Sequence, residues 1–401
     1  MRILLIDVNC KNSSTGRIVY DLFRDAKKRG DEAVLCYGRG TLIREESVYK
    51  FGLDWETYIH AGLSRITGYN GCFSRLSTKR LLYIIEWFKP DVIHIHELHA
   101  YFVDIKLLVE YIKKTHIKVV WTFHCEYMYT GKCGHANECS KFERECGHCP
   151  ELHTYPKSLF FDRTRDMFQM KKRLLTDMDV TIVCPSEWLR ERVGRSFLKE
   201  KKIDVIYNGV DIEAFHPTDS QVIRKKLQIS PKNKVVLSVG ADILSEEKGG
   251  HEVQRLAERF GTDITFILAG AKINKLIKKG NIIILPTLTN TEHLARLYTV
   301  ADVFLLCSKK ETFSMTCAEA LCCGTRVVGY QSGAPETIFK GHYATFVEQG
   351  NIDVLEREIK KALAEEWTYE NRKICAAEAQ QKYGKDQMTE KYFNLYRRIA
   401  G

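Results

Sequence analysis

Short apolar runs alternate with longer amphipathic stretches along both halves of this 401-residue chain. Several runs are apolar nearly throughout, which is typical of parallel strands covered on both faces. The longer stretches carry apolar residues at helical spacing, and this alternation predicts βαβ units. Strands are predicted at residues 3–8, 33–37, 92–95, 119–123, 180–184, 205–207, 235–239, 264–269, 282–285, 303–306, 327–330 and 345–347. Helices are predicted at residues 19–29, 79–89, 105–114, 251–260, 292–300, 314–323, 354–366 and 385–399.

The pattern restarts after Asn208-Gly209-Val210-Asp211, so two doubly wound, Rossmann-like α/β domains facing a central cleft are predicted. The first domain is expected to span residues 1–208, and the second is expected to span residues 209–384. The last helix, within residues 385–401, is a candidate to pack back on the first domain. Ligands bind at the carboxyl ends of strands in open parallel sheets, so residues that directly follow predicted strands are candidate site residues.

Composition and charge narrow the class of protein. Hydrophobic residues make up 44% of the chain and charged residues 28%, and the formal net charge is +10. No apolar run reaches the ~20 residues that a membrane-spanning helix needs, and the N-terminus is predicted to be a strand rather than a signal peptide. We therefore expect a cytoplasmic protein, peripheral on the inner face of the plasma membrane if its acceptor is lipid-linked.

The positive charge favours anionic partners: a diphosphate, a lipid-linked acceptor or an anionic membrane surface. No motif supports binding to nucleic acid, so none is expected. Two basic stretches, residues 75–89 and 163–175, are predicted to be amphipathic helices docked on the sheet, with contact to a bilayer as the alternative.

Two glutamates eight residues apart, Glu311 and Glu319, follow the predicted strand at residues 303–306. Glu311 would lie on the loop leaving the strand, and Glu319 inside the next helix. One carboxylate can then face a sugar while the other binds a ribose, which indicates a nucleotide-sugar enzyme. The amides of Phe313, Ser314 and Met315, at the start of that helix, can hold phosphate.

Two further loops suit a charged donor. Gly16 and Arg17 lie in the first βα turn, and Gly240 and Lys248 follow the first strand of the second half. A fixed cation such as Lys248 can stabilise the charge that a departing nucleoside diphosphate gains. The Asp-x-Asp triplet at residues 177–179 precedes a strand, on the wrong side of the sheet for a site. Catalysis is therefore expected to be independent of a divalent metal.

These residues resemble the Glu-x7-Glu motif and the Lys-Gly loop of the retaining GT-B glycosyltransferases of family 4. The resemblance implies a UDP-sugar or GDP-sugar donor, with Glu311 on the sugar, Glu319 on the ribose and the backbone at Leu285 on the base. It also implies that the second domain binds this donor and that the first domain lies on the acceptor side. It also implies same-face attack with no covalent enzyme intermediate, so Glu311 is not assigned as a nucleophile. Ala241 occupies the position where the family commonly has arginine, so the motif does not identify the residue that supplies a second cation.

His124 ends an apolar strand in the first half and is similar to the family's Thr-x-His triplet. The resemblance implies contact with the donor sugar, and a structural histidine is the alternative. His94, His96 and His99 follow the preceding strand and are expected to be structural or to lie on the acceptor side.

Four cysteines, Cys133, Cys139, Cys146 and Cys149, have the spacing C-x5-C-x6-C-x2-C. Structural zinc, two disulfides and free thiols are all consistent with this spacing, and a cytosolic location argues against disulfides. The stretch resembles family 4 transferases of colanic acid or O-antigen type. A zinc held by four cysteines has no open position, so no catalytic role is assigned to it.

The sequence therefore predicts a hexosyl-type transferase that moves a sugar to a glycan or lipid-linked oligosaccharide in surface polysaccharide assembly. Two alternatives remain open. A GT-B enzyme of epimerase type would need an acid/base set that the sequence does not display. A basic zinc-containing binding protein would leave Glu311, Glu319 and Lys248 without a role.

Overall fold

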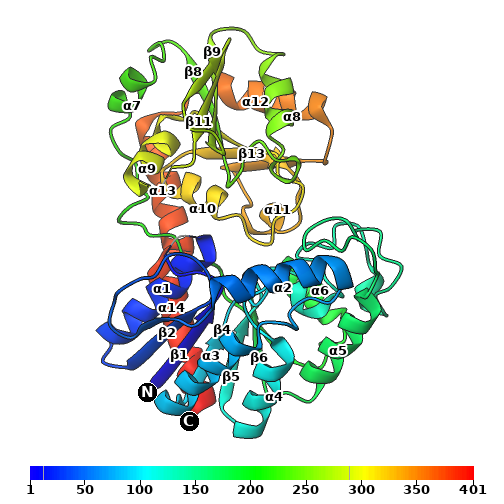
Figure 1. Cartoon of the computed structure of the whole chain (residues 1–401). Helices are drawn as coiled ribbons and strands as arrows, with labels where there is room; N and C mark the ends of the chain where they lie inside the picture. Colours follow the sequence, from blue (N-terminus) through cyan, green and yellow to red (C-terminus); the bar gives the residue numbers. More distant parts are fainter. Residues whose placement is uncertain (12, 289) are drawn as a thin grey trace. The chain divides into compact units, whose positions relative to one another are not determined.

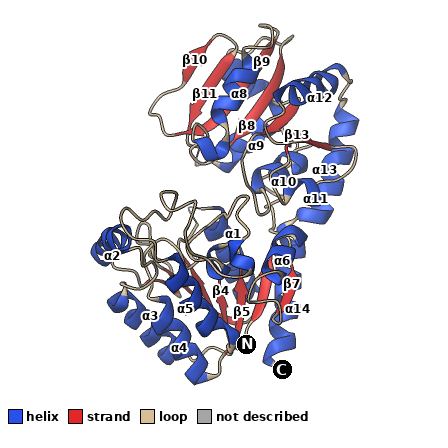
Figure 2. Cartoon of the chain, turned by 90° about the vertical axis from the view of Figure 1, so that its right-hand side faces the viewer, coloured by secondary structure: helices blue, strands red, loops and turns tan. Residues whose placement is uncertain are grey.

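The computed structural model describes residues 1–11, 13–288 and 290–401. The chain forms two compact units: Met1–Tyr207 with Thr389–Gly401, and Asn208–Met388. In each unit a sheet lies between helices (Figure 2). Among the described helices, none combines the length and the apolar character that crossing a bilayer requires.

The sheet of the first unit is parallel throughout, in the order β3-β2-β1-β4-β5-β6-β7. Its strands are β1 (Arg2–Asp7), β2 (Glu32–Tyr37), β3 (Val48–Lys50), β4 (Val92–Ile95), β5 (Lys118–Thr122), β6 (Thr181–Cys184) and β7 (Lys202–Val205). The central strands are buried along their length, because helices cover both faces.

The helices of the first unit are α1 (Ser14–Lys28), α2 (Asp54–Thr67), α3 (Arg75–Phe88), α4 (Ile105–Thr115), α5 (Thr164–Thr176) and α6 (Glu187–Gly194). Two 3-10 turns, η1 (Tyr127–Tyr129) and η2 (Lys141–Glu143), lie in the loop after β5. The final helix α14 (Lys385–Ala400) belongs to this unit from Thr389 onward (red in Figure 1). Arg29 pairs with Glu390 at 2.9 Å, and Tyr396 Oη shares a 2.6 Å hydrogen bond with His94 Nδ1.

The sheet of the second unit has the order β10-β11-β9-β8-β12-β13-β14, and only β10 among its described strands is antiparallel. Its strands are β8 (Lys234–Val239), β9 (Ile264–Ala271), β10 (Ile277–Lys279), β11 (Ile282–Pro286), β12 (Val303–Leu306), β13 (Arg326–Tyr330) and β14 (Ala344–Val347). Its helices are α7 (Gln221–Lys226), α8 (Gly250–Ala257), α9 (Thr291–Val300), α10 (Met315–Cys322), α11 (Pro335–Ile338), α12 (Ile352–Ala364) and α13 (Tyr369–Tyr383), with the 3-10 turn η3 (Glu246–Lys248).

Most predicted strands and helices are confirmed to within a few residues. The strand predicted at residues 205–207 is wrong: β7 ends at Val205 and starts at Lys202. This edge strand is only half-buried, so it lacks the continuous apolar run of its neighbours. The second basic stretch does form a helix, α5, in which Lys171 is fully buried.

Candidate functional site

The strongest candidate cluster of the second unit lies where its strand order reverses. Strand β8 pairs with β9 on one side and with β12 on the other, and ligands bind at the carboxyl ends of strands at such a point. Lys248 follows β8 and Glu311 follows β12. Their side chains meet there, with Lys248 Nζ donating to Glu311 Oε1 at 2.7 Å.

This pair is partly open to solvent, since 31% of the Lys248 side chain and 16% of the Glu311 side chain are exposed. The charge of Glu311, opposed by burial, raises the pKa of Lys248 above its ordinary value. The lysine is therefore a fixed cation at neutral pH, which is the group that a leaving diphosphate needs.

Backbone contacts hold both members of the pair in place. Gly249 has φ +70°, and a Cβ there would lie 2.1 Å from the carbonyl oxygen of Cys307, so only glycine lets η3 pack against the end of β12. Glu311 N donates to Ser332 O at 2.8 Å, and Ala334 N donates to Glu311 O at 3.1 Å. The Lys-Gly and Glu positions predicted from sequence are thus held together by backbone contacts.

Helix α10 begins beside Glu311. Ser314 caps it with φ +74°, accepting a hydrogen bond from Cys317 N at 3.4 Å, and Met315 is its first residue. The Phe313 ring is buried against Phe339, with ring centroids 5.9 Å apart. The helix start therefore lies at the same edge of the sheet as Lys248, as an anion site requires.

Glu319 lies one further turn into α10 and is buried. Tyr298 Oη of α9 donates to Glu319 Oε2 at 2.8 Å. The hydroxyl of Ser332, which follows β13, is buried. Its Oγ has no hydrogen-bond partner among the residues that the structure describes. An orphaned hydroxyl at the carboxyl edge is a feature expected of a ligand site.

Gly240 and Leu285 lie at this edge too, at the ends of β8 and β11. A Cβ on Gly270 of β9 would lie 2.0 Å from Gly240 O, so the ends of β8 and β9 meet closely. Lys272, directly after β9, was not singled out in the sequence. Its Nζ lies 2.7 Å from Asp242 Oδ2, next to Ala241, and its position right after a strand was the available signal.

In the first unit, Gly16 and Arg17 open α1. Ser13 Oγ accepts a hydrogen bond from Gly16 N at 2.9 Å, and a Cβ on Gly16 would crowd Ser13 and Asn9. Arg17 is exposed. Asn12, in the middle of this predicted turn, lies outside the described residues.

His124 follows β5 and is buried against His96, which follows β4. His96 Nδ1 and His124 Nε2 are 3.0 Å apart, and the rings stack at 5.3 Å. Burial lowers the pKa of His124 to about 4, so the ring is neutral at physiological pH. His96 Nε2 is buried without a hydrogen-bond partner in the described part of the chain.

His94 is held by Thr122 Oγ1 at 2.8 Å as well as by α14, which fits its predicted structural role.

A group of titratable side chains that the sequence did not reveal lies beside His124. His99 Nε2 and Cys125 Sγ both contact Glu97 Oε2, at 2.8 and 3.2 Å. Burial alone would raise the pKa of Glu97, but the charge of His99 holds it at about 2. Burial, reinforced by Glu97, raises the pKa of Asp7 to about 7, and Glu97 N donates to Asp7 Oδ1 at 3.1 Å. These groups come from the ends of β1, β4 and β5, so no local motif unites them.

The four clustered cysteines line one small cavity. None of the four forms a disulfide, and Gly131 N donates to Cys146 Sγ at 3.2 Å. Two buried lysines lie beside them: Lys132, which donates to the carbonyls of Leu152 and Thr154, and Lys171, which donates to that of Tyr127 at 2.6 Å. Within the described chain, Glu97, His99 and Cys125 are the only three potential ligand atoms that lie within 4.8 Å of one another. No three of the four cysteine sulfurs therefore lie within 4.8 Å of one another, although Cys133 and Cys149 share a hydrogen bond.

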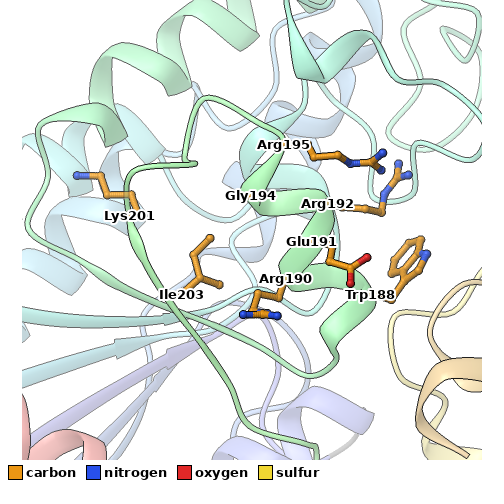
Figure 3. Close-up of a pocket in the computed structure, with 8 residues that line it drawn as sticks. All are labelled: Trp188, Arg190, Glu191, Arg192, Gly194, Arg195, Lys201 and Ile203. Carbon is orange, nitrogen blue, oxygen red and sulfur yellow. The ribbon is translucent and has the colours of Figure 1, made fainter.

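A more open pocket lies on α6 and β7, beside the loop that carries the cysteines (Figure 3). Its cations are already engaged: Arg192 binds Glu126 at 2.6 Å, Arg190 binds Glu187 at 2.6 Å, and Lys201 donates to Met178 O at 2.6 Å. We therefore treat it as part of the scaffold.

Comparison with known proteins identifies the families that the two units resemble. Residues 15–214 match the model described as Glycosyltransferase Family 4, and residues 219–382 match that of Glycosyl transferases group 1. WcaC of Escherichia coli (strain K12), named as a colanic acid biosynthesis glycosyl transferase, is 22% identical over the full length of both chains. Alpha-galactosylglucosyldiacylglycerol synthase of Streptococcus pneumoniae (strain ATCC BAA-255 / R6) is 25% identical over 56% of this chain and 62% of its own.

Solved structures share the fold. Sucrose-phosphate synthase from Thermosynechococcus elongatus superposes with a TM-score of 0.72 at 14% identity, covering 99% of this chain and 98% of its own. Anabaena HepE, solved in complex with UDP-glucose, superposes with a TM-score of 0.69 at 15% identity over the whole of both chains. The fold class predicted from sequence, two Rossmann-like domains of GT-B type, is confirmed. The chain is a glycosyltransferase and belongs to the GT-B enzymes that join a family 4 domain to a group 1 domain.

Proposed function

We propose that this protein is a retaining glycosyltransferase that moves a hexose from a UDP-sugar or GDP-sugar to a growing surface glycan, including lipid-linked ones. The observation that carries the proposal is the Lys248–Glu311 pair at the reversal point of the second sheet. The likeness to WcaC supports surface polysaccharide assembly, and the UDP-glucose complex of HepE supports a uridine donor.

Each candidate site residue of the second unit then has a chemical role in the proposed reaction. Lys248 stabilises the negative charge of the departing nucleoside diphosphate, and the amides at the start of α10 hold its phosphates. Glu311 orients Lys248 and accepts hydrogen bonds from the donor sugar. Glu319, held by Tyr298, accepts from the ribose, and the backbone at Gly240 and Leu285 borders the donor. Lys272 is our candidate for the cation that Ala241 does not supply.

In the first unit, we propose that Gly16 and Arg17 border the donor and that neutral His124 contacts the donor sugar. His124 cannot act as a general acid at neutral pH, because its pKa is about 4. Its ring can still donate or accept one hydrogen bond to a sugar hydroxyl.

The cysteine cavity is proposed to hold a structural zinc. Four thiols on one cavity form a suitable donor set, and a zinc bound by four thiolates carries net negative charge that Lys132 and Lys171 would offset. When bound, the metal would fix the loop after β5 and take no part in transfer. The protein's own residues at the donor site are expected to support turnover without a further divalent ion.

The test is release of nucleoside diphosphate from a panel of UDP-, GDP-, ADP- and dTDP-sugars by the purified protein. We expect slow hydrolysis of one UDP-sugar or GDP-sugar that persists in EDTA, with the melting temperature recorded to detect loss of a structural metal. Absence of both release and calorimetric binding across the panel would refute the proposal. With an acceptor in hand, the anomeric configuration of the product, read by NMR, tests retention.

A further inference from the structure

Helix α2 is amphipathic, but its polar side faces the protein and its apolar side faces solvent. Its buried residues are polar: Glu56, Thr57, His60 and Ser64. The Glu56 carboxylate accepts hydrogen bonds from Leu76 N at 2.8 Å and Ser77 N at 2.7 Å, at the start of α3. The polar side of α2 therefore anchors it to the protein, and hydrophobic packing does not.

The opposite side of α2 carries large apolar residues that recur at helical spacing and face solvent: Trp55, Tyr58, Ile59, Leu63 and Ile66. Tyr58 is 73% exposed, Trp55 54% and Ile59 53%. A contiguous apolar face of this kind on a soluble protein marks an interaction site. Figure 2 shows α2 at the left margin of the first unit, beyond α3 and α5.

Exposed apolar residues also lie beside the last turn of α2 and along α3. Leu159 N donates to Arg65 O at 2.8 Å, which places exposed Leu159, Phe160 and Phe161 beside the last turn of α2. Exposed Tyr83 and Trp87 lie along α3, and the Trp87 ring contacts that of Tyr49, with centroids 6.2 Å apart. We call α2, residues 159–161 and the exposed side of α3 the docking face.

Exposed cations are set among these apolar residues: Arg65, Arg75, Lys79, Arg80 and Arg163. The Arg163 guanidinium lies 5.8 Å from the centre of the Phe161 ring. The exposed acids of α2 and α3 are Asp54, already paired with Lys50 at 2.7 Å, and Glu86. The docking face is therefore both apolar and positively charged.

We propose that the docking face binds an anionic lipid bilayer, with α2 lying in the plane of the membrane. Aromatic side chains mixed with arginine and lysine are typical of helices at the lipid headgroup level, where apolar residues enter the bilayer and cations meet phosphate. In a twofold dimer, the docking face would pack against the same face of a second copy, and the cations of the two copies would repel each other. The inference rests on the proposed function for its partner, since a lipid-linked acceptor resides in a membrane.

The test is flotation of the full-length protein with vesicles of equal parts phosphatidylglycerol and phosphatidylcholine, or of phosphatidylcholine alone. The variant is Trp55→Ser with Tyr58→Ser and Ile59→Ser. The matched control replaces three exposed apolar residues of the second unit, Val222→Ser, Tyr369→Ser and Ile374→Ser. We expect the wild type and the control to float with the anionic vesicles, in a salt-sensitive manner, and the α2 variant to bind at least about tenfold more weakly.

All three proteins should keep the same melting temperature, because the replaced side chains are exposed. Flotation of the α2 variant equal to that of the wild type would overturn the proposal, as would a wild type that binds neither vesicle. Self-association of the wild type that the α2 variant abolishes would assign the face to a protein contact and also overturn it. Donor hydrolysis measured without vesicles separates the two ideas: a protein that floats but hydrolyses no donor keeps the docking face and loses the proposed function.

Discussion

Glu311 and Glu319 carry the same carboxylate but lie in different surroundings. Glu311 is half-buried and paired with Lys248, whereas Glu319 is buried on the hydroxyl of Tyr298. The eight-residue spacing, read with the strand before it and the helix start within it, predicts that both lie near one sheet edge. It does not reveal Tyr298, because that partner comes from a different helix.

Tyr298→Phe should destabilise the protein, because it removes a hydrogen bond to a buried carboxylate. We expect a loss of about 1.5–3 kcal/mol in the free energy of unfolding and weaker donor binding. Tyr330→Phe is the control, since the buried Tyr330 hydroxyl has no hydrogen-bond partner in the described residues and its removal should be near neutral. Urea unfolding of both variants checks this, and equal losses would show that the Tyr298–Glu319 bond adds nothing.

Asp7→Asn should stabilise the protein, and more so at higher pH. The pKa of Asp7 is raised from 3.8 to about 7 by burial, so the unfolded chain ionises first and wild-type stability falls as pH rises through this window. The advantage of the variant should grow by up to ~1.4 kcal/mol per pH unit between about pH 4 and 7 and then level off. Asp91→Asn, at an exposed aspartate that also accepts a backbone hydrogen bond, is the control. A pH-independent difference for Asp7→Asn would contradict the account.

At the scale of elements, the short turn η3 decides where Lys248 lies. Sequence spacing identifies the Lys-Gly pair, but not that Gly249 meets the backbone of Cys307. Long-range contacts of this kind depend on how two strands end, which no local pattern encodes.

Gly249→Ala should therefore lower the free energy of unfolding by more than the strain of its positive φ alone would. Gly280→Ala is the matched control: it also has positive φ, at +59°, but a Cβ there would meet nothing within 4 Å. We expect about 1 kcal/mol for Gly280→Ala, and a larger loss with reduced donor turnover for Gly249→Ala. Thermal unfolding and turnover are the measurements, and matching effects of the two variants would contradict the packing argument.

The loop after β5 provides the test of the proposed zinc. We expect about one zinc per chain by elemental analysis, and a lower melting temperature with less bound zinc in Cys133→Ser. Cys72→Ser, at a half-buried cysteine outside the cluster, should change neither. Zinc-free wild-type protein whose stability Cys133→Ser leaves unchanged would remove the metal from the account.

Prediction of helices and strands from sequence fails where polar side chains are buried, where apolar side chains face solvent, or where an element is short. The strands β3 and β10 are three residues long at sheet edges, too short for a visible pattern. Helix α13 buries small residues such as Ala376 and Ala379, which give a weak periodic signal. Helix α2 was missed although its apolar spacing is regular, and that apolar side faces solvent.

At the scale of the whole molecule, the chain repeats one doubly wound plan twice, and α14 carries its end back to the first unit. The family and fold follow from that plan and from the second half's motifs. The polar group of Asp7, Glu97 and Cys125 needed the structure, because three separate strands, β1, β4 and β5, bring it together.

The turnover of three variants on the accepted donor tests most directly whether the Lys248–Glu311 pair performs sugar transfer. Lys248→Ala and Glu311→Ala should lower kcat by about 100-fold or more while the melting temperature changes little. Lys360→Ala, which breaks a surface pair with Glu356 of similar length (2.6 Å), should act like wild type. Wild-type kcat in both Lys248→Ala and Glu311→Ala would contradict the account.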